Sequence, residues 1–420
     1  MEHTKATPAK LSSYQIFVIV ILALTQFTVI LDFMVMSPLG DMLMKSMNLT
    51  TAQFGVTVSV YAFTAGISGL LTAGFADRYD RKKLLMFFYV GFILGTLMCG
   101  LTNSYTMLLI ARIVTGLFGG VIGSISMAIV ADLFTLEQRG RVMGFMQMGF
   151  GASQVLGVPI SLYFANHFGW NAPFMAIVVL AFLIWSLILT RLKPIDKHLA
   201  VQMEHHPVQH LIRTLFNKEY RIGYMATCLL SLGGFMMMPW GSTFAVNNLH
   251  ITNEQLPKLF MVGGVSILLI MPMIGKISDK INKFKLFAVA SIWMCVIVVI
   301  HTHLSAIPLW FAMIINVLMM IGIMGRMVPS MALNSALPNM QDRGAFMSVS
   351  SSLQQIAGGF AAVIGGMIVV QKDKYSPLEH FDSLGYVIVV ITLVSVFLVY
   401  RVYKLIESKT TPQLNVAMQH

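Results

Sequence analysis

Residues 73–85 read AGFADRYDRKKLL, and a related stretch, GKISDKINKFKLF, occupies residues 275–287. In both stretches an aspartate is followed by basic residues and then by an apolar run. A second match pairs EQRGRVMGF at 137–145 with QDRGAFMSV at 341–349. The two matches are offset by 202 and 204 residues, so the sequence predicts two similar halves that follow one another along the chain. In transporters built from such repeats, the substrate site lies where the repeats meet.

The composition is that of a membrane protein over its whole length. Of the 420 residues 57% are hydrophobic and only 11% are charged, and the mean hydropathy is +0.77. Soluble domains carry about 25% charged residues. The net charge of +11 does not indicate a nucleic-acid partner, because the basic residues lie in short segments between apolar runs rather than on one face.

Apolar runs of about 20 residues, the length that a spanning helix needs, recur twelve times. Six precede a polar stretch at 192–219 and six follow it, which divides the chain into 1–191, a linker at 192–219, and 220–420. The predicted spans are 14–39, 51–76, 83–101, 105–132, 138–165, 168–191, 220–246, 252–275, 285–303, 306–335, 341–370 and 382–404.

The distribution of lysine and arginine predicts the orientation of these spans. With the N-terminus inside, 22 of the 28 basic residues fall in cytoplasmic segments and two, Arg112 and Arg326, fall inside spans. Only four, Lys45, Lys258, Lys372 and Lys374, fall in external loops. This asymmetry predicts twelve spans with both termini cytoplasmic.

The linker contains one amphipathic stretch, PVQHLIRTLFN at 207–217. Its proline start and its apolar residues at helical spacing predict a short helix. Such a helix either lies on the cytoplasmic membrane surface or packs on the protein.

The stretch at 73–85 resembles the pattern Gly-x-x-x-Asp-Arg-x-Gly-Arg-Lys, the signature of the major facilitator superfamily. It departs from the pattern at Ala73 and at Asp80, which stands at the turn glycine, where Asn282 stands in the second half. Aspartate and asparagine tolerate a left-handed backbone better than other non-glycine residues, so we expect the turn to survive.

Two further stretches carry the same resemblance. ARIVTGLFGG at 111–120 is similar to the fourth-span motif of the family, in which glycines follow an arginine within the membrane. GVPISLYFANHFGWNAPF at 157–174 resembles the fifth span of the drug and sugar proton-antiporter branch, the arabinose-efflux-permease-like proteins, with Asn171 in place of an arginine. Ser161 and Leu162 stand where antiporters often have glycines. The resemblance implies that the protein forms two pseudo-symmetric six-helix bundles. It also implies that the protein is a monomer located in a bacterial inner membrane.

Among the acidic residues only Asp32 lies deep inside a predicted span. It is 18 residues into an outward-going span, about 27 Å along the helix, and Arg112 is seven residues into an inward-going one. The two side chains therefore lie at similar depth, where a contact forms either a proton site controlled by Arg112 or a static ion pair between two helices. In drug–proton antiporters of the family, a first-span acid takes up and releases the proton and a fourth-span arginine controls its affinity.

The second charge within the membrane, Arg326, has no deep acid in its own half. It is expected to bind an anionic substrate group, to face a water-filled cavity, to reach Asp32, or to be solvated by backbone carbonyls and by Asn316 or Asn334. The other candidate substrate contacts are polar or aromatic residues within spans: Trp240, Gln147, Gln154, Asn316 and Gln354.

Charged residues also gather at the cytoplasmic ends of the spans. Family resemblance implies a conformational latch built from Asp77, Arg81, Asp132, Arg139 and Asp279. Individual exposed salt bridges contribute little, so a network is needed. The alternative is that these basic residues only anchor the topology. No P-loop or nucleotide-binding glycine motif is present, and the histidines and cysteines are not spaced as metal ligands, so we expect no cofactor, no metal site and no enzymatic activity.

These observations predict a proton-coupled secondary transporter that works by alternating access and exports a small amphipathic or sugar-like compound. Two alternatives within transport are a Spinster-type exporter of lipids or lysolipids and a proton-coupled importer. Outside transport, the alternative is a receptor or scaffold with a transporter fold.

Overall fold

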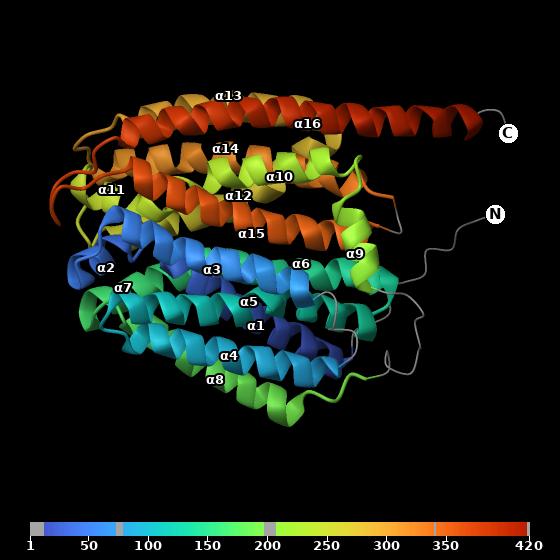
Figure 1. Cartoon of the computed structure of the whole chain (residues 1–420), viewed down its shortest axis with the longest axis horizontal. Coiled ribbons are helices and arrows are strands. Elements are labelled where there is room, and N and C mark those ends of the chain that lie inside the picture. The colour runs from blue at the N-terminus through green and yellow to red at the C-terminus, as the bar shows by residue number, and fades with distance from the viewer. Residues whose placement is uncertain (1–11, 73–78, 197–206, 340–341, 418–420) are drawn as a thin grey trace.

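The computed structural model describes residues 12–72, 79–196, 207–339 and 342–417. Within these ranges the chain is almost wholly helical, and the only β pairing is an isolated bridge between Val370 and Glu379. The helices lie side by side along one direction (Figure 1). Their bounds are α1 Ser13–Val35, α2 Gly40–Met47, α3 Thr51–Thr72, α4 Arg81–Leu101, α5 Tyr105–Leu133, α6 Leu136–Ala152, η2 Ser153–Gly157, α7 Val158–Phe168, α8 Ala172–Arg191, α9 Pro207–Leu215, α10 Arg221–Phe235, η4 Met238–Trp240, α11 Gly241–Asn247, α12 Leu256–Lys280, α13 Lys283–Thr302, α14 Leu309–Ala336, α15 Arg343–Ile368 and α16 Phe381–Ala417.

Ten helical segments in the described ranges, one of them made of consecutive helices, are long enough and apolar enough to cross a membrane. Two further segments bring the number to the twelve spans that the sequence predicts. One is α6–η2–α7, which a π-helical turn divides into shorter helices, and the other is α15, whose glutamines and serines make it less apolar. The prediction of an all-α membrane protein with twelve spanning helices is confirmed.

The helices fall into two sets that share one long seam. In the first set α4 packs on α5 and α8, and α1 packs on α6 and α8; in the second, α10 packs on α15 and α16, and α13 packs on α14 and α16. The sets touch where α3 lies along α15 and where α7 and η2 lie against α12 (Figure 1).

Glycines allow the two sets to approach closely at this seam. A Cβ atom added to Gly55 of α3 would lie 2.6 Å from the Ala362 carbonyl oxygen of α15, and one added to Gly66 would lie 2.8 Å from the Ser352 carbonyl oxygen. Because the obstructing atoms belong to the backbone, a larger residue would force the two helices apart.

Two spanning paths break at equivalent prolines, Pro38 after α1 and Pro239 after α10. Proline has no backbone N–H to donate and clashes with the preceding turn, so each path continues as a short helix, α2 or α11. These short helices lie together at one end of the bundle, called here the far end. The opposite end, where α1 begins and α8 and α16 end, is called the linker end (Figure 1).

The amphipathic stretch of the linker forms α9 and packs on α15. Leu211 and Leu215 lie against a cluster of buried second-half residues, while Ile212 and Phe216 are exposed. One part of its apolar surface therefore packs on protein and another part is open.

Candidate functional site

The centre of the first helix set holds a fully buried ion pair. Arg112 Nη1 of α5 lies 2.8 Å from Asp32 Oδ2 of α1, and the side chains are 1% and 0% exposed. Thr96 of α4 donates a hydrogen bond of 3.2 Å to the other carboxylate oxygen. Two helices, α4 and α5, thus supply the partners of this α1 carboxylate, and the two charged residues predicted at similar depth are in contact.

Arg112 is held by an aromatic ring as well as by the acid. Its guanidinium carbon lies 4.5 Å from the centre of the Tyr61 ring of α3, a distance suited to a cation–π interaction. Its Nε atom is buried and has no hydrogen-bond partner among the described residues. The guanidinium has therefore kept one N–H group free for another acceptor, such as water or a rearranged carboxylate.

An aromatic contact links this pair to the second helix set. The Tyr61 ring stacks on Phe33 of α1 with centroids 5.2 Å apart, and Phe33 lies 6.1 Å from Phe235 of α10. Because Phe235 belongs to the second set, a continuous series of side-chain contacts connects the Arg112 guanidinium with the opposite half.

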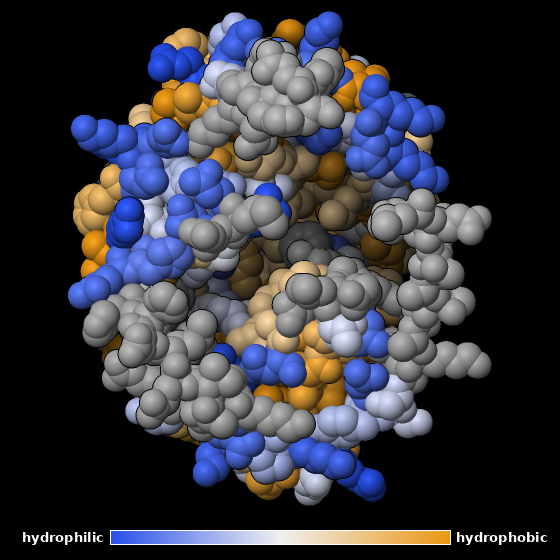
Figure 2. All heavy atoms as spheres, turned by 90° about the vertical axis from the view of Figure 1, so that its right-hand side faces the viewer, coloured by the Kyte–Doolittle hydropathy of each residue, from blue (hydrophilic) through white to orange (hydrophobic). Residues whose placement is uncertain are grey.

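The molecule is hollowed at the linker end. Figure 2 views this end directly and shows a central depression whose walls are largely apolar and whose rim carries hydrophilic side chains. An opening of this kind gives a solute access from the linker end.

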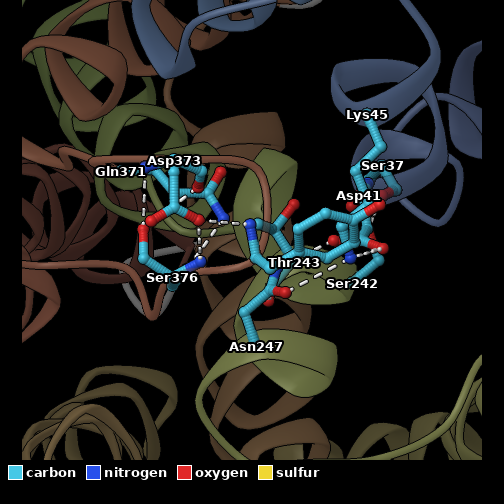
Figure 3. Close-up of polar contacts among 10 residues, drawn as sticks. Ser37, Asp41, Lys45, Ser242, Thr243, Asn247, Gln371, Asp373 and Ser376 are labelled. Carbon is cyan, nitrogen blue, oxygen red and sulfur yellow. Dashed lines mark hydrogen bonds and ion pairs between the residues drawn. The ribbon is translucent and has the colours of Figure 1, made fainter. Parts of the chain in front are cut away.

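Polar bonds join the two helix sets at the far end (Figure 3). Asn247 Nδ2 of α11 donates a bond of 2.8 Å to Asp41 Oδ1 of α2, while Asn247 Oδ1 accepts one of 3.3 Å from Lys45 Nζ. Lys45 also pairs with Asp41 at 2.8 Å within α2. Asp41 is only 1% exposed, so these partners, rather than solvent, provide the hydrogen bonds of its carboxylate.

Two serines next to the helix breaks at Pro38 and Pro239 also form hydrogen bonds between the two helix sets. Ser242 Oγ donates to the Ser37 carbonyl at 2.6 Å, and Ser37 Oγ donates to the Met238 carbonyl. We call Ser37, Asp41, Lys45, Ser242 and Asn247 the far-end gate. The gate is closed while the linker end is hollow, which is the arrangement of a transporter open at one end.

The structure places Arg326 away from Asp32. The side chain is 4% exposed, donates a bond of 3.2 Å to Ser395 Oγ of α16, and lies over the Phe287 ring of α13 at 5.9 Å. Within the described residues it has no acidic partner, and its buried Nε has no hydrogen-bond partner. The geometry brings it to neither Asn316 nor Asn334.

The other candidate substrate contacts lie in different surroundings. Trp240 is 0% exposed and packs edge-on against Phe54, while the Asn316 oxygen is buried beside Gly263. Gln154 is half-buried in the π turn η2, and Gln354 is exposed on α15. The side chain of Gln147 lies outside the described part of the chain.

One contact of the predicted latch is present at the linker end. Arg81 Nε lies 3.1 Å from Asp132 Oδ2, which joins the start of α4 to the end of α5. Asp279 is exposed at the end of α12 and makes no ion pair with the described residues. Asp77 and the side chain of Arg139 lie outside the described part.

A second polar cluster fastens α9 to the start of α15. Asp342 accepts hydrogen bonds from the Tyr220 hydroxyl at 2.7 Å and from His210 Nε2 at 2.8 Å. These bonds favour the ionised form, so they hold the pKa of the Asp342 carboxyl below its usual range. No group of residues suited to a metal ion occurs among those described.

The far-end gate is the main feature that the sequence analysis missed. Asp41 falls between the predicted spans 14–39 and 51–76, and Asn247 directly follows the predicted span 220–246, so neither is among the predicted site residues. Two signals could have found it: the spacing of Asp41 and Lys45 by four residues, which places them on one helix face, and the equivalent prolines Pro38 and Pro239.

Comparisons with known proteins agree with this architecture. A family model described as Major Facilitator Superfamily matches residues 22–362. Two relatives from Bacillus subtilis (strain 168), both named uncharacterized MFS-type transporters, are each 22% identical. YceJ aligns over 86% of this chain and 92% of its own, and YbcL over 90% and 95%.

Solved structures with the same fold cover nearly the whole chain. A bacterial homolog to the human lysosomal transporter Spinster, inward-facing and unoccupied, has a TM-score of 0.77 at 13% identity, covering 95% of this chain and 99% of that one. A D-xylose–proton symporter has a TM-score of 0.76 at 19% identity, with coverage of 94% and 98%. With its twelve spanning helices, its repeated halves and a family match over most of its length, the chain belongs to the Major Facilitator Superfamily of membrane transporters.

Proposed function

We propose that the protein is a proton-coupled secondary transporter that exports a small amphipathic or sugar-like compound, with Asp32 as the proton site. The observation that carries this proposal is the buried Asp32–Arg112 pair, since a carboxylate deep in a membrane protein is costly and is kept where it serves a function.

The energetics suit a site that gains and loses a proton. Removing one partner of a buried ion pair costs about 3–5 kcal/mol, because the other charge is left uncompensated. Protonation of Asp32 has the same effect on Arg112, whose guanidinium then depends on the Tyr61 ring and on an acceptor, such as water, that reaches its unpaired Nε–H group. One proton moving inward supplies about 2.3 kcal/mol per 100 mV, so repeated cycles drive extrusion.

The proposed orientation places the linker end in the cytoplasm of a bacterial cell and the far end outside. The lysine and arginine asymmetry supports this assignment, and the bacterial relatives support the inner membrane. In that orientation the hollow of Figure 2 opens inward and the far-end gate is the external gate. The two halves, 1–191 and 220–420, then rock as units joined by the linker at 192–219, and one chain suffices for the cycle.

Substrate contacts are proposed at residues that lie near the meeting of the halves. Gln154 is in η2, which contacts α12, and Gln354 is on α15, which contacts α3. Arg326 is proposed to engage an anionic group only in another conformation, since it is buried among α13, α14 and α16 here.

The test is proton flux in proteoliposomes loaded with a pH-sensitive dye. A panel of amphipathic drugs, sugars including D-xylose, and lysolipids is added under an imposed pH gradient, and both substrate movement and proton flux are recorded. We expect Asp32→Asn to abolish pH-driven substrate accumulation while substrate binding persists.

Asp382→Asn is the matched control, because it removes an exposed carboxylate at the edge of a span. Undiminished proton-driven accumulation in Asp32→Asn would refute the assignment of the proton site. Binding without any flux in the wild-type protein would favour a receptor or scaffold. Net uptake along the proton gradient would favour an importer, and transport of lysolipids alone would favour the lipid exporter.

A further inference from the structure

An apolar groove lies on the side of the molecule, between α4 and α8 and backed by α5. Its volume is about 370 Å³, and we call it the lateral groove. It is lined by Met86, Phe87, Val90 and Leu94 of α4, by Phe118 of α5 and by Trp185 of α8. Gly91 shapes its floor, because a Cβ there would lie 2.2 Å from the Phe118 ring, which packs directly against the α4 backbone.

The groove faces the bilayer. Phe87 and Leu94 on its rim are 62% and 52% exposed, which for residues within a spanning helix means contact with lipid. The stretch from Met86 to Leu94 extends about 12 Å along α4, beginning about 8 Å from the linker end of that helix. The groove therefore lies in the leaflet at the linker end.

One polar group in the groove lacks a protein partner. The Trp185 Nε1 atom is buried and makes no hydrogen bond to any described residue. In contrast, Trp293 Nε1 donates to the Leu318 carbonyl at 2.9 Å. A buried indole N–H normally finds an acceptor. Here protein covers the Nε1 atom, so Trp185 contributes apolar surface to the groove. Trp185 lies about 9 Å from Arg191 along α8, within the hydrocarbon region of the bilayer.

Basic side chains surround the linker-end mouth of the groove. Lys83 is exposed one turn below Phe87, and Arg191 is exposed at the end of α8. Lys82 Nζ donates to the Leu189 and Leu192 carbonyls at 2.9 and 2.6 Å, which ties the two helices together and adds positive charge at this mouth.

The acid nearest in sequence to these lysines is already engaged. Asp80 caps the start of α4 by accepting bonds from the Lys82 and Lys83 amides. The mouth thus keeps exposed positive charge that complements an anionic headgroup.

We propose that the lateral groove binds one anionic phospholipid from the leaflet at the linker end. The phosphate lies between Lys83 and Arg191, and an acyl chain packs on Val90, Leu94 and the Trp185 indole. The site is separate from the Asp32–Arg112 pair, so it stands independently of the proposed transport reaction.

The test uses the native tryptophan fluorescence of the full-length protein in phosphatidylcholine vesicles. A minor fraction of the lipid is replaced by brominated phosphatidylglycerol or by brominated phosphatidylcholine, and quenching is titrated against mole fraction. We expect stronger quenching by the anionic lipid, a preference that disappears in Trp185→Phe. The preference should fall about 25-fold in Lys83→Gln/Arg191→Gln, because each basic residue near the surface contributes about fivefold.

The matched control is Lys285→Gln/Arg401→Gln, which removes two exposed basic residues, one in the first turn of α13 and one on α16. Between α13 and α16, near these two residues, the Phe284 ring packs on the Tyr400 and Tyr403 rings, with centroids 5.2 and 5.9 Å apart. The control residues therefore lie beside packed aromatic rings and away from the lateral groove. We expect this variant to keep the wild-type preference.

Three results would overturn the proposal. Equal quenching by the two brominated lipids would mean ordinary annular contact. An equal loss of preference in the control variant would mean general attraction of anionic lipid to a basic membrane face. Quenching unchanged between wild type and Trp185→Phe, with the protein dimeric in the vesicles, would mean that a second copy covers the groove.

Discussion

The far-end gate offers the sharpest test of how the two helix sets are held, and Asn247→Ala is the perturbation of choice. The amide of Asn247 makes two bonds that cross between the sets, to Asp41 at 2.8 Å and from Lys45 at 3.3 Å. The Lys45–Asp41 bond lies within α2 and survives the substitution. The variant therefore weakens the closure without removing a charge.

The magnitude follows from these two bonds. A hydrogen bond to a charged group contributes about 1.5–3 kcal/mol, and both are replaced by bonds to water when the gate opens. A net loss of about 3 kcal/mol raises the ratio of gate-open to gate-closed molecules by about 100-fold. A state that is scarcely populated in the wild type becomes readily detectable at that ratio.

The assay is double electron–electron resonance between spin labels at Ser46 and Thr252, two exposed positions on opposite sides of the gate. The labels are introduced into protein whose three native cysteines, Cys99, Cys228 and Cys295, have been replaced. We expect a longer-distance population in Asn247→Ala that is minor or missing in the parent protein.

The adjacent Asn248 provides the control. Its amide also makes two bonds, to the Leu378 carbonyl at 3.0 Å and from the Leu378 amide at 2.9 Å, but both lie within the second set. Asn248→Ala should leave the distances unchanged. An unchanged distribution in Asn247→Ala, or an equal shift in Asn248→Ala, would contradict the role given to the gate.

Two further predictions concern the seam and the linker. Gly55→Ala places a methyl group 2.6 Å from the Ala362 carbonyl oxygen, so we expect a lower Tm and slower transport, whereas Gly234→Ala, with open space around it, should change neither; equal Tm values for the two variants would contradict the close approach of α3 and α15. Because the folded pKa of Asp342 is depressed, its stabilising contribution is present above the unfolded pKa of about 3.9 and is lost as the pH falls through the folded pKa. Asp342→Asn should therefore lower Tm at neutral pH, and the difference from wild type should narrow below about pH 4; a constant difference at all pH values would point to lost packing instead.

The sequence predicted what depends on distances along a helix. Asp32 and Arg112 could be matched in depth because every helical residue advances the chain by about 1.5 Å, and the structure brings the two into contact. The direction in which each side chain points around the helix axis was harder to predict. Asn316 and Arg326 are ten residues apart on α14, which places them about 80° apart around the helix. The two side chains therefore face different neighbours.

The far-end gate could not be predicted in the same way, because it depends on tertiary contact between two helix breaks. A proline predicts where a helix ends, but not which other break it meets. In the sequence, Asp41 and Lys45 look like an ordinary exposed ion pair. In the structure α11 packs against α2, and Asn247 forms hydrogen bonds with both residues. For this reason the sequence identified Asp32 but not Asp41 as a buried carboxylate. Asp41 is buried by packing between helices rather than by its place in an apolar run.

The buried pair and the gate differ in how a conformational change affects them. Asp32, Arg112, Thr96 and Tyr61 all belong to the first helix set, so a rocking motion of the sets leaves their contacts in place. A proton can shift the conformational equilibrium only through interactions that differ between the two states. Such interactions exist where the sets meet, and the contact between Phe33 and Phe235 is the one that continues directly from the Tyr61 ring. In the proposed proton-coupled cycle, proton binding at Asp32 would therefore act on the gate through the orientation of Arg112 and the aromatic rings beside it.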